Sequence, residues 1–296
     1  MKQFSILILS IILAACGMTS QSQTGTAATA GSQMSADDAR MAAGHAHDSP
    51  VATPAATTPP VQETTGETVV YAEIDGQKIS GYLARPKKTR GKLPGLIVIH
   101  EWWGLNDNVR EEARRLAAEG YVTLAVDLYG GKTATEVKDA MGLSTALTKN
   151  PAPAEENLRQ AYRYLDKTVG APRIGTIGWC LGGRWSLRTA ILLPKSVDAT
   201  VIYYGAVNVP EEDLAALQMP ILGLFGSKDP VIPLATVQTF EETMKRLGKN
   251  VDVHVYEGAQ HAFANPSGTS YQAAAAEDAW RRTTAFLKSH LQDGGS

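Results

Sequence analysis

The chain has 296 residues, 44% of them hydrophobic, and a formal net charge of −2. A charge balance this close to even gives no indication of nucleic-acid binding, which we do not expect, or of steering toward highly charged ligands. The length is sufficient for one folded domain with a substantial core.

The N-terminus has the layout of a secretory signal peptide. Lys2 precedes an apolar run at residues 4–13, and two alanines precede Cys16. The apolar run is too short to span a bilayer. Residues 13–16 resemble the lipobox of bacterial lipoproteins, in which the cysteine is acylated after cleavage. We therefore expect a lipoprotein that loses residues 1–15 and is anchored to a membrane by Cys16 alone, facing the periplasm or the exterior. A plain secretory signal or a short anchor is the alternative.

Residues 16–66 predict a disordered tether. They are rich in Ala, Thr, Ser, Gln, Gly and Pro and contain few large apolar side chains, so they cannot bury enough surface to offset their ordering entropy. His45 and His47 could bind a metal weakly, but we expect solvated side chains and no metal site. The folded domain is predicted at residues 67–292.

The domain opens with a predicted β-hairpin. Residues 68–74 and 78–85 alternate in strand fashion around the turn sequence Asp75-Gly76. Residues 96–99 are a fully apolar run, which is typical of a strand covered on both faces. A helix follows, capped by Asn106 or Asp107 and ended by Gly120.

The strand and helix pattern then repeats. Residues 122–126 predict a strand, a variable stretch follows, and residues 154–169 predict a helix. The remaining expected elements are strands at 173–177, 199–204, 221–225 and 251–256, and helices at 181–193, 234–247 and 272–291. This alternation predicts an α/β fold with a mostly parallel sheet, helices on both faces and reactive loops at the carboxyl ends of the strands.

The strongest chemical motif lies between a predicted strand and a predicted helix. Residues 178–183 read Gly-Trp-Cys-Leu-Gly-Gly, which is the nucleophile elbow with cysteine in place of serine. The glycines allow the strand and the helix to approach closely, and the helix N-terminus favours a thiolate. Cys180 has no intramolecular disulfide partner, because Cys16 belongs to the lipobox. A buried structural cysteine is the alternative.

A base and an acid follow the nucleophile in the chain order that this fold uses. Asp229 lies after the strand at 221–225, and His261 lies after the strand at 251–256. We expect His261 to serve the thiol of Cys180 and Asp229 to orient His261. A turn-capping role for Asp229 and a structural role for His261 are the alternatives.

Acyl transfer also requires an oxyanion hole. The backbone N–H of Leu181 follows the nucleophile and provides one donor. The N–H of Trp102, after the strand that ends at His100, is the best candidate for the second. Glu101 places a carboxylate at the same edge of the sheet, and an ordinary surface glutamate is its alternative reading.

Five ordered motifs together resemble the dienelactone hydrolase family. They are residues 99–104 (Ile-His-Glu-Trp-Trp-Gly), 127–129 (Asp-Leu-Tyr), 178–183, 225–229 (Phe-Gly-Ser-Lys-Asp) and 258–263 (Gly-Ala-Gln-His-Ala-Phe). The resemblance covers residues 67–290 and implies the α/β-hydrolase fold. It also implies ester or lactone hydrolysis through an acyl-enzyme, without metal or organic cofactor.

By the same resemblance, Cys180 attacks the carbonyl, His261 handles the proton and Asp229 orients His261. The family's glutamate corresponds to Glu101, and it keeps the resting thiol unreactive until substrate displaces the glutamate. Such a thiol would be less prone to oxidation. Unchanged alkylation of Cys180 after Glu101→Gln would contradict this role.

The departures from the family concern substrate binding. Dienelactone hydrolases bind the substrate carboxylate with two arginines; here the second is missing and Lys132 replaces the first at best. Lysine does not reproduce a bidentate arginine clamp. We therefore expect a small, less acidic ester or lactone. The residues expected to line its pocket, with core packing as their alternative role, are Trp102, Trp103, Tyr129, Lys132, Trp179 and Phe263.

Two other classes of function remain as alternatives. The first is a non-catalytic envelope binding protein on the same fold. The second is a thiol redox protein or a cysteine peptidase. The absence of a Cys-x-x-Cys pair argues against redox exchange, and nothing in the sequence favours a peptide over an ester substrate. The sequence leaves the natural substrate, the oligomeric state and the choice of membrane undetermined.

Overall fold

The computed structural model describes residues 36–45, 48 and 60–293. The predicted signal peptide, the lipidation site Cys16 and His47 lie outside these residues. No helix in the described part is both long enough and apolar enough to cross a membrane.

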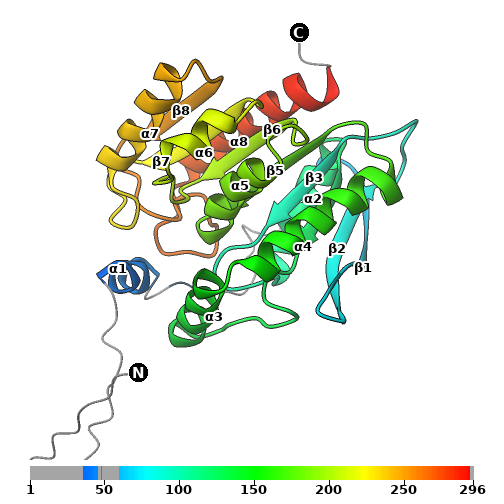
Figure 1. The fold of residues 1–296 in the computed structure, drawn as a ribbon, viewed down its shortest axis with the longest axis horizontal. Helices are drawn as coiled ribbons and strands as arrows, with labels where there is room; N and C mark the ends of the chain where they lie inside the picture. Colours follow the sequence, from blue (N-terminus) through cyan, green and yellow to red (C-terminus); the bar gives the residue numbers. More distant parts are fainter. Residues whose placement is uncertain (1–35, 46–47, 49–59, 294–296) are drawn as a thin grey trace, which may run out of the picture. The chain divides into compact units, whose positions relative to one another are not determined.

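Eight strands form one sheet in the order β1-β2-β4-β3-β5-β6-β7-β8 (Figure 1). The six strands from β4 to β8 are parallel, and β2 runs antiparallel to both of its neighbours. This order is that of the α/β-hydrolase fold and confirms the predicted fold class. The strands are β1 (Thr64–Ile74), β2 (Gln77–Pro86), β3 (Gly95–Ile99), β4 (Val122–Val126), β5 (Ile174–Trp179), β6 (Ala199–Tyr203), β7 (Ile221–Gly226) and β8 (Val251–Tyr256).

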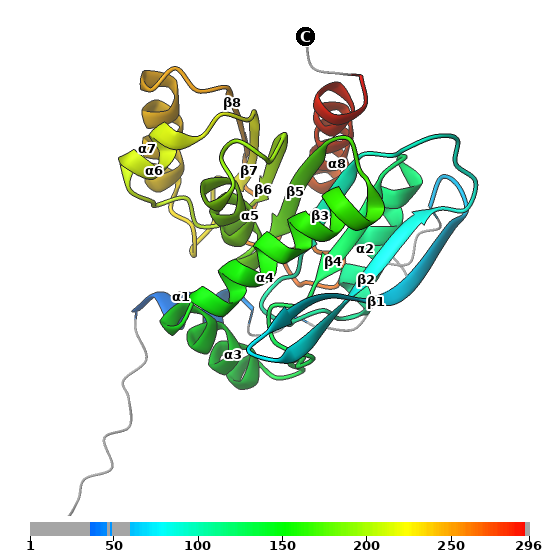
Figure 2. The same ribbon diagram turned by 45° about the vertical axis from the view of Figure 1, so that its right-hand side comes forward.

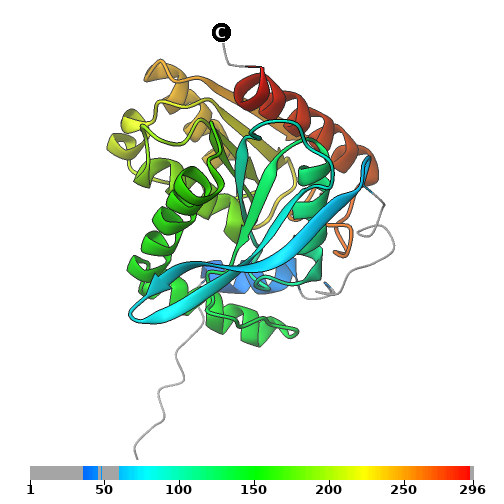
Figure 3. The same cartoon turned by 90° about the vertical axis from the view of Figure 1, so that its right-hand side faces the viewer.

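Strands β1 and β2 are the predicted hairpin, which forms a long twisted ribbon at one edge of the sheet (Figure 3). Asp75 and Gly76 occupy its turn with φ angles of 51° and 77°. Both angles are positive, as the hairpin turns that match strand twist require.

The central strands are buried on both faces, so alternate residues enter two different cores. In β3, Leu96 and Val98 pack on the side of α2 and α8, whereas Ile97 and Ile99 pack on the side of α4. Helices α5, α6 and α7 cover the second face beside β6 and β7. Figure 2 shows α4 and α5 in front of the sheet and α8 behind it. These helices are α2 (Asp107–Ala118), α4 (Ala152–Arg163), α5 (Leu181–Leu192), α6 (Glu211–Ala216), α7 (Leu234–Arg246) and α8 (Ala273–Leu287).

The predicted helix boundaries hold with local exceptions. Asn106 caps α2 by accepting a hydrogen bond of 3.2 Å from the N–H of Val109. Helices α4 and α8 each continue into a π-helical turn, η1 (Tyr164–Val169) and η2 (Lys288–Gln292). Helix α3 (Val137–Lys149) lies in the stretch that the sequence left without an assigned element.

The largest departure concerns the predicted tether. Residues Ala36–Gly44 form helix α1, which lies beside α3 (Figure 1). Strand β1 begins at Thr64, slightly before the predicted domain start at residue 67. The expectation of an unstructured tether is therefore wrong for residues 36–44.

Candidate active site

Cys180 occupies the sharp turn between β5 and α5 that the elbow motif predicts. Its φ angle is +54° and its ψ angle is −116°, a conformation that residues with a side chain rarely adopt. The turn is held by the Cys180 N–H, which donates to the carbonyl of Tyr203 at 3.0 Å. The Cys180 carbonyl accepts from the N–H of Arg184 at 3.2 Å and so starts the helix.

Glycines make this turn possible because the backbones around it are in contact. A Cβ atom on Gly178 would lie 2.2 Å from the carbonyl oxygen of Gly182. A Cβ atom on Gly182 would lie 2.2 Å from the carbonyl oxygen of Ile99 on the neighbouring strand. The predicted reason for these glycines, close approach of strand and helix, agrees with this geometry.

Asp229 and His261 form the pair expected from the chain order. The Nδ1 atom of His261 lies 2.8 Å from Oδ2 of Asp229, and both side chains are buried. The other carboxylate oxygen accepts from the backbone N–H groups of Val231 and Ile232 at 2.7 and 2.8 Å. Asp229 therefore caps its own turn and orients the histidine at the same time. The Nε2 atom of His261 is buried and has no hydrogen-bond partner among the described residues.

The thiol of Cys180 lies beside two imidazoles. One ligand atom each of Cys180, His261 and His45 lies within 4.8 Å of the other two. The Sγ atom is 3.7 Å from Nε2 of His45. His45 is fully buried, so the expectation that it is solvated is wrong. Its Nδ1 atom lies 2.5 Å from Oδ2 of Asp48, so this segment brings a second histidine and carboxylate pair to the thiol.

The ring of His45 fills the space above the nucleophile. It packs against Trp102 with ring centroids 4.6 Å apart and meets His261 edge-on at 5.1 Å. Burial lowers the pKa of His45, which keeps the imidazole neutral at neutral pH. A cavity of about 30 Å³ remains nearby, lined by Glu101, Trp179, Tyr204, Asn265 and neighbouring residues.

Backbone strain concentrates around this site. Among the described residues, four other than glycine have a positive φ angle. Three of them are Cys180, Tyr204 at the end of β6, and Ala262 directly after the histidine. Tyr204 lies 5.3 Å from the ring of His261. Such strain persists only where the surrounding structure imposes it, and it is typical of functional sites.

The resting thiol is protonated. Burial raises the pKa of Cys180 well above its usual value, and at a pH where Glu101 is ionised its charge raises the thiol pKa further. The N–H of Leu181 acts in the opposite direction but is outweighed. The helix N-terminus therefore acts in the predicted direction, but desolvation outweighs its effect on the pKa of the thiol.

The predicted oxyanion donors lie on neighbouring strands. Strands β3 and β5 are paired, with Ile99 opposite Gly178. Trp102 and Leu181 follow these two strand ends by a few residues and are both buried. The sheet therefore brings the two predicted N–H groups to the same edge, next to the nucleophile.

Glu101 is buried beside the thiol, but its hydrogen bond goes elsewhere. Its Oε2 atom accepts from Nδ2 of Asn265 at 2.8 Å, and its Oε1 atom has no partner among the described residues. Burial raises the pKa of Glu101 to about 8, with the charge of Asp48 as the next cause. Glu101 is therefore protonated at neutral pH. Because its side chain is buried, it is also not the ordinary surface glutamate that was the alternative interpretation.

This raised pKa predicts a pH-dependent stability. In the unfolded chain Glu101 ionises near its ordinary value, so between about pH 4.5 and pH 8 the unfolded state loses a proton that the folded state keeps. The stability from this group is complete below about pH 4.5 and is lost as pH rises to about 8. Glu101→Gln has no such proton. Its free energy of unfolding relative to the wild type should thus rise by a few kcal/mol from pH 5 to pH 8, at about 1.4 kcal/mol per unit.

Urea denaturation of both proteins at the two pH values measures this difference. Comparing variant with wild type cancels the other titrating groups, which the two proteins share. An equal difference at pH 5 and pH 8 would show that Glu101 is ionised throughout.

The predicted pocket residues divide into two groups. Trp179 lines the small cavity, and Trp103 packs against Trp102 with centroids 5.1 Å apart. Phe263 is fully buried between Tyr204 and Tyr256, so its role is core packing and not pocket lining.

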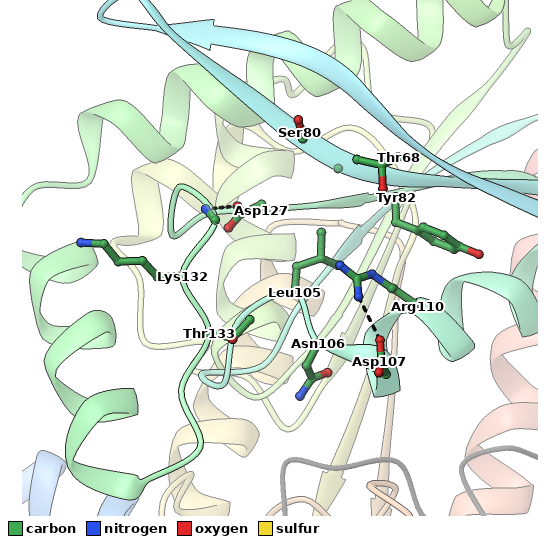
Figure 4. A pocket seen from close by; sticks show the side chains of 12 residues that line it. Thr68, Ser80, Tyr82, Leu105, Asn106, Asp107, Arg110, Asp127, Lys132 and Thr133 are labelled. Atoms are coloured by element: carbon green, nitrogen blue, oxygen red, sulfur yellow. Dashed lines mark hydrogen bonds and ion pairs between the residues drawn. The ribbon is translucent and has the colours of Figure 1, made fainter.

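Lys132 and Tyr129 both line a pocket of about 390 Å³. The buried phenol of Tyr129 is still close enough to Cys180 for the charges of the two groups to interact. Lys132 is exposed and also lines a pocket of about 500 Å³ between the hairpin and the start of α2. Figure 4 shows its amine pointing away from Arg110, which pairs with Asp107. None of the predicted catalytic residues lines either pocket, so Lys132 does not join the site around Cys180.

Four residues at the site were not predicted as part of it. Asn265 and Tyr204 follow strands and lie beside Glu101 and His261, and their positions after predicted strands could have indicated them. His45 and Asp48 come from the predicted tether, where the sequence offered only the Gly-His-Ala-His-Asp pattern.

Comparison with known proteins decides the family. Residues 79–291 match the dienelactone hydrolase family. The chain belongs to this family. A relative from Saccharolobus solfataricus, described as "Putative carboxymethylenebutenolidase", is 34% identical over 75% of this chain and 98% of its own length. "Protein usf" from Aquifex pyrophilus is also 34% identical, with the same coverage of both chains.

A solved structure supports the same assignment. The structure described as a "Putative Dienelactone Hydrolase" from Klebsiella pneumoniae has a TM-score of 0.68 and 29% sequence identity, and it covers 76% of this chain and 99% of that one. The dienelactone hydrolase family member described here is therefore a hydrolase with the α/β-hydrolase fold. The relatives align with about three quarters of the chain, which is close to the extent of the predicted folded domain.

Proposed function

We propose that this protein hydrolyses carboxylic esters or lactones through a covalent acyl-enzyme on Cys180. The observation that carries the proposal is the buried hydrogen bond between Asp229 and Nδ1 of His261, which leaves Nε2 free on the side of the thiol. Nucleophile, base and orienting acid then stand in the order that triad chemistry requires. A non-catalytic binding protein would have no use for this arrangement or for the strained turn at Cys180.

The reaction proceeds in two halves. In the first, Nε2 of His261 takes the proton from Sγ of Cys180, and the thiolate attacks the carbonyl carbon of the ester. The N–H groups of Leu181 and Trp102 bind the oxyanion that forms. The bond to the alcohol oxygen breaks, His261 gives that oxygen its proton, and a thioester on Cys180 remains.

In the second half, water hydrolyses the thioester. His261 takes a proton from the water as it attacks the acyl carbon, and the carbon–sulfur bond breaks. The sulfur recovers a proton and the carboxylic acid leaves. Asp229 stays ionised throughout and stabilises the imidazolium that forms in each half.

The resting state limits unwanted reactions of the thiol. With its pKa raised by burial, Cys180 holds its proton until substrate and His261 are correctly placed. Glu101 is protonated and hydrogen-bonded to Asn265 at the same time. A protonated, buried thiol is a poor target for oxidants, which suits a protein that we expect to be exported.

We further propose a substrate of low charge. The cavity beside Cys180 is lined by Trp179, Tyr204 and Val109, together with Asn265 and the protonated Glu101. None of the residues that line it is a lysine or an arginine, and Lys132 points into other pockets. A strongly acidic dienelactone would lack a cationic partner here, whereas a neutral ester or lactone would not need one.

Trapping of the acyl-enzyme tests the mechanism. We expect the full chain, mixed with p-nitrophenyl acetate and quenched in acid, to carry an acetyl group on the peptide that contains Cys180, as measured by mass spectrometry. Cys180→Ala should carry none there and should release p-nitrophenol at the buffer rate. Equal hydrolysis by the two proteins would overturn the proposal.

A further inference from the structure

The histidine from the N-terminal segment creates a donor set that ester hydrolysis does not require. Cys180, His261 and His45 are all buried, and their ligand atoms lie within 4.8 Å of one another. The thiol and the two imidazoles come from three distant parts of the chain. Sγ of Cys180 and Nε2 of His45 are 3.7 Å apart.

Both imidazoles are oriented in the same manner. Nδ1 of His45 is hydrogen-bonded to Asp48 at 2.5 Å, and Nδ1 of His261 is hydrogen-bonded to Asp229 at 2.8 Å. A carboxylate on Nδ1 fixes the proton there and leaves the lone pair on Nε2. Metal-binding histidines usually donate their other ring N–H to a carboxylate in this way, which fixes the tautomer and the orientation of the ring. The Nε2 atom of His261 is buried without a partner among the described residues, so a ligand for it would remove the cost of an unsatisfied buried acceptor.

We propose that Cys180, His261 and His45 form an inhibitory site for Zn²⁺, in which the metal joins the N-terminal segment to the catalytic thiol. One thiolate and two neutral imidazoles are typical zinc ligands, and about 3.5 Å between ligand atoms fits a tetrahedral ion. The Cys180–His45 separation of 3.7 Å nearly matches this value, and the other separations, which are at most 4.8 Å, must contract when the ion binds. Hard cations such as Mg²⁺ prefer oxygen ligands and do not suit these donors.

Metal binding and hydrolysis exclude each other at this site. Zn²⁺ binds the thiolate of Cys180, and the thiol proton passes to the buffer. The same ion takes the Nε2 lone pair that His261 needs as a base. His45 completes the set of three protein ligands and holds the end of helix α1 beside the nucleophile. A chelator that removes the ion restores the free thiol and base.

Zinc titration of the full chain tests the site without relying on turnover. We expect metal-free protein to bind one Zn²⁺ per chain in competition with a chromophoric chelator. His45→Ala should weaken binding by a factor of about 100 or more, and Asp48→Asn by about 10 to 100, the range for loss of an outer-shell partner. His254→Ala is the matched control, because His254 also lies near a carboxylate, 3.9 Å from Asp278, but away from Cys180. The zinc affinity of this variant should equal that of the wild type.

Co²⁺ offers a spectroscopic check of the ligands. The thiolate charge-transfer band of the Co²⁺ form should be present in the wild type and absent in Cys180→Ala. Where the wild type hydrolyses p-nitrophenyl acetate, Zn²⁺ but not Mg²⁺ should inhibit it and a chelator should restore it. Wild-type zinc affinity in His45→Ala, or a Co²⁺ form without a thiolate band, would overturn the site even if the esterase proposal holds. Tight zinc binding without any esterase activity would leave the site standing and remove the esterase proposal.

Discussion

Replacing His261 by alanine should lower kcat for p-nitrophenyl acetate by a factor of about 10³ to 10⁴. The thiol of Cys180 is protonated at rest because burial raises its pKa, so it cannot attack without a base. His261 combines a buried carboxylate partner, Asp229, with an Nε2 atom that has no hydrogen-bond partner among the described residues. The loss corresponds to about 4 to 5.5 kcal/mol of transition-state stabilisation.

His45 provides the comparison that makes this test sharp. It also pairs with a carboxylate and lies 3.7 Å from the thiol, so distance alone would favour it as the base. However, it belongs to the segment that fills the cleft above Trp102 and His261. We therefore expect His45→Ala, assayed with a chelator present, to raise kcat/KM several-fold by opening the cleft. A loss as large as that of His261→Ala would identify His45 as the base instead.

Gly182→Ala should lower the free energy of unfolding by about 3 kcal/mol or more. The added Cβ atom would lie 2.2 Å from the carbonyl oxygen of Ile99 and 2.7 Å from that of His100. Both neighbours are backbone atoms, at the last residue of the central strand β3 and directly after it, and cannot easily move aside, so helix α5 must shift away from the sheet. The shift would also displace Cys180, which starts this helix.

Gly142→Ala is the matched control. Gly142 lies within helix α3, and an added Cβ atom would meet no other heavy atom within 4 Å. Alanine there should stabilise the protein by about 0.5 to 1 kcal/mol, because glycine is the poorer helix former. Urea denaturation of the two variants and the wild type measures both effects. A Gly182→Ala protein within 1 kcal/mol of the wild type would show that the contact between helix and strand is not tight.

The features that the sequence predicted are those encoded locally. A buried strand such as β3 is a short apolar run, and the elbow at Cys180 is a contiguous pattern of glycines around the nucleophile. The order of Asp229 and His261 along the chain predicted that these two side chains would pair near Cys180, as they do. These parts of the fold and site follow from short windows of sequence and from the rule that parallel strands end at the same edge.

The features that were missed depend on distant contacts. His45 and Cys180 are separated by 135 positions, and nothing in the composition around His45 indicates burial. The hydrogen bond from Asn265 to Glu101 spans 164 positions. The depth at which Cys180 is buried, which outweighs the effect of the helix terminus on the thiol pKa, is likewise not visible in the sequence around it.

The strand order has a consequence for how the histidine reaches its place. Cys180 follows β5 and His261 follows β8, with β6 and β7 between them, so about 14 Å of sheet separates the two strand ends. The connection after β8 spans this gap by passing over β7, where the N–H of Lys228 donates to the carbonyl of Ala259 at 2.9 Å. The length of this loop after β8, and not the position of β8 in the sheet, therefore brings the imidazole of His261 close to Cys180. Deletion of a few residues from this loop should abolish hydrolysis, because His261 would no longer lie near Cys180, while all eight strands keep their register.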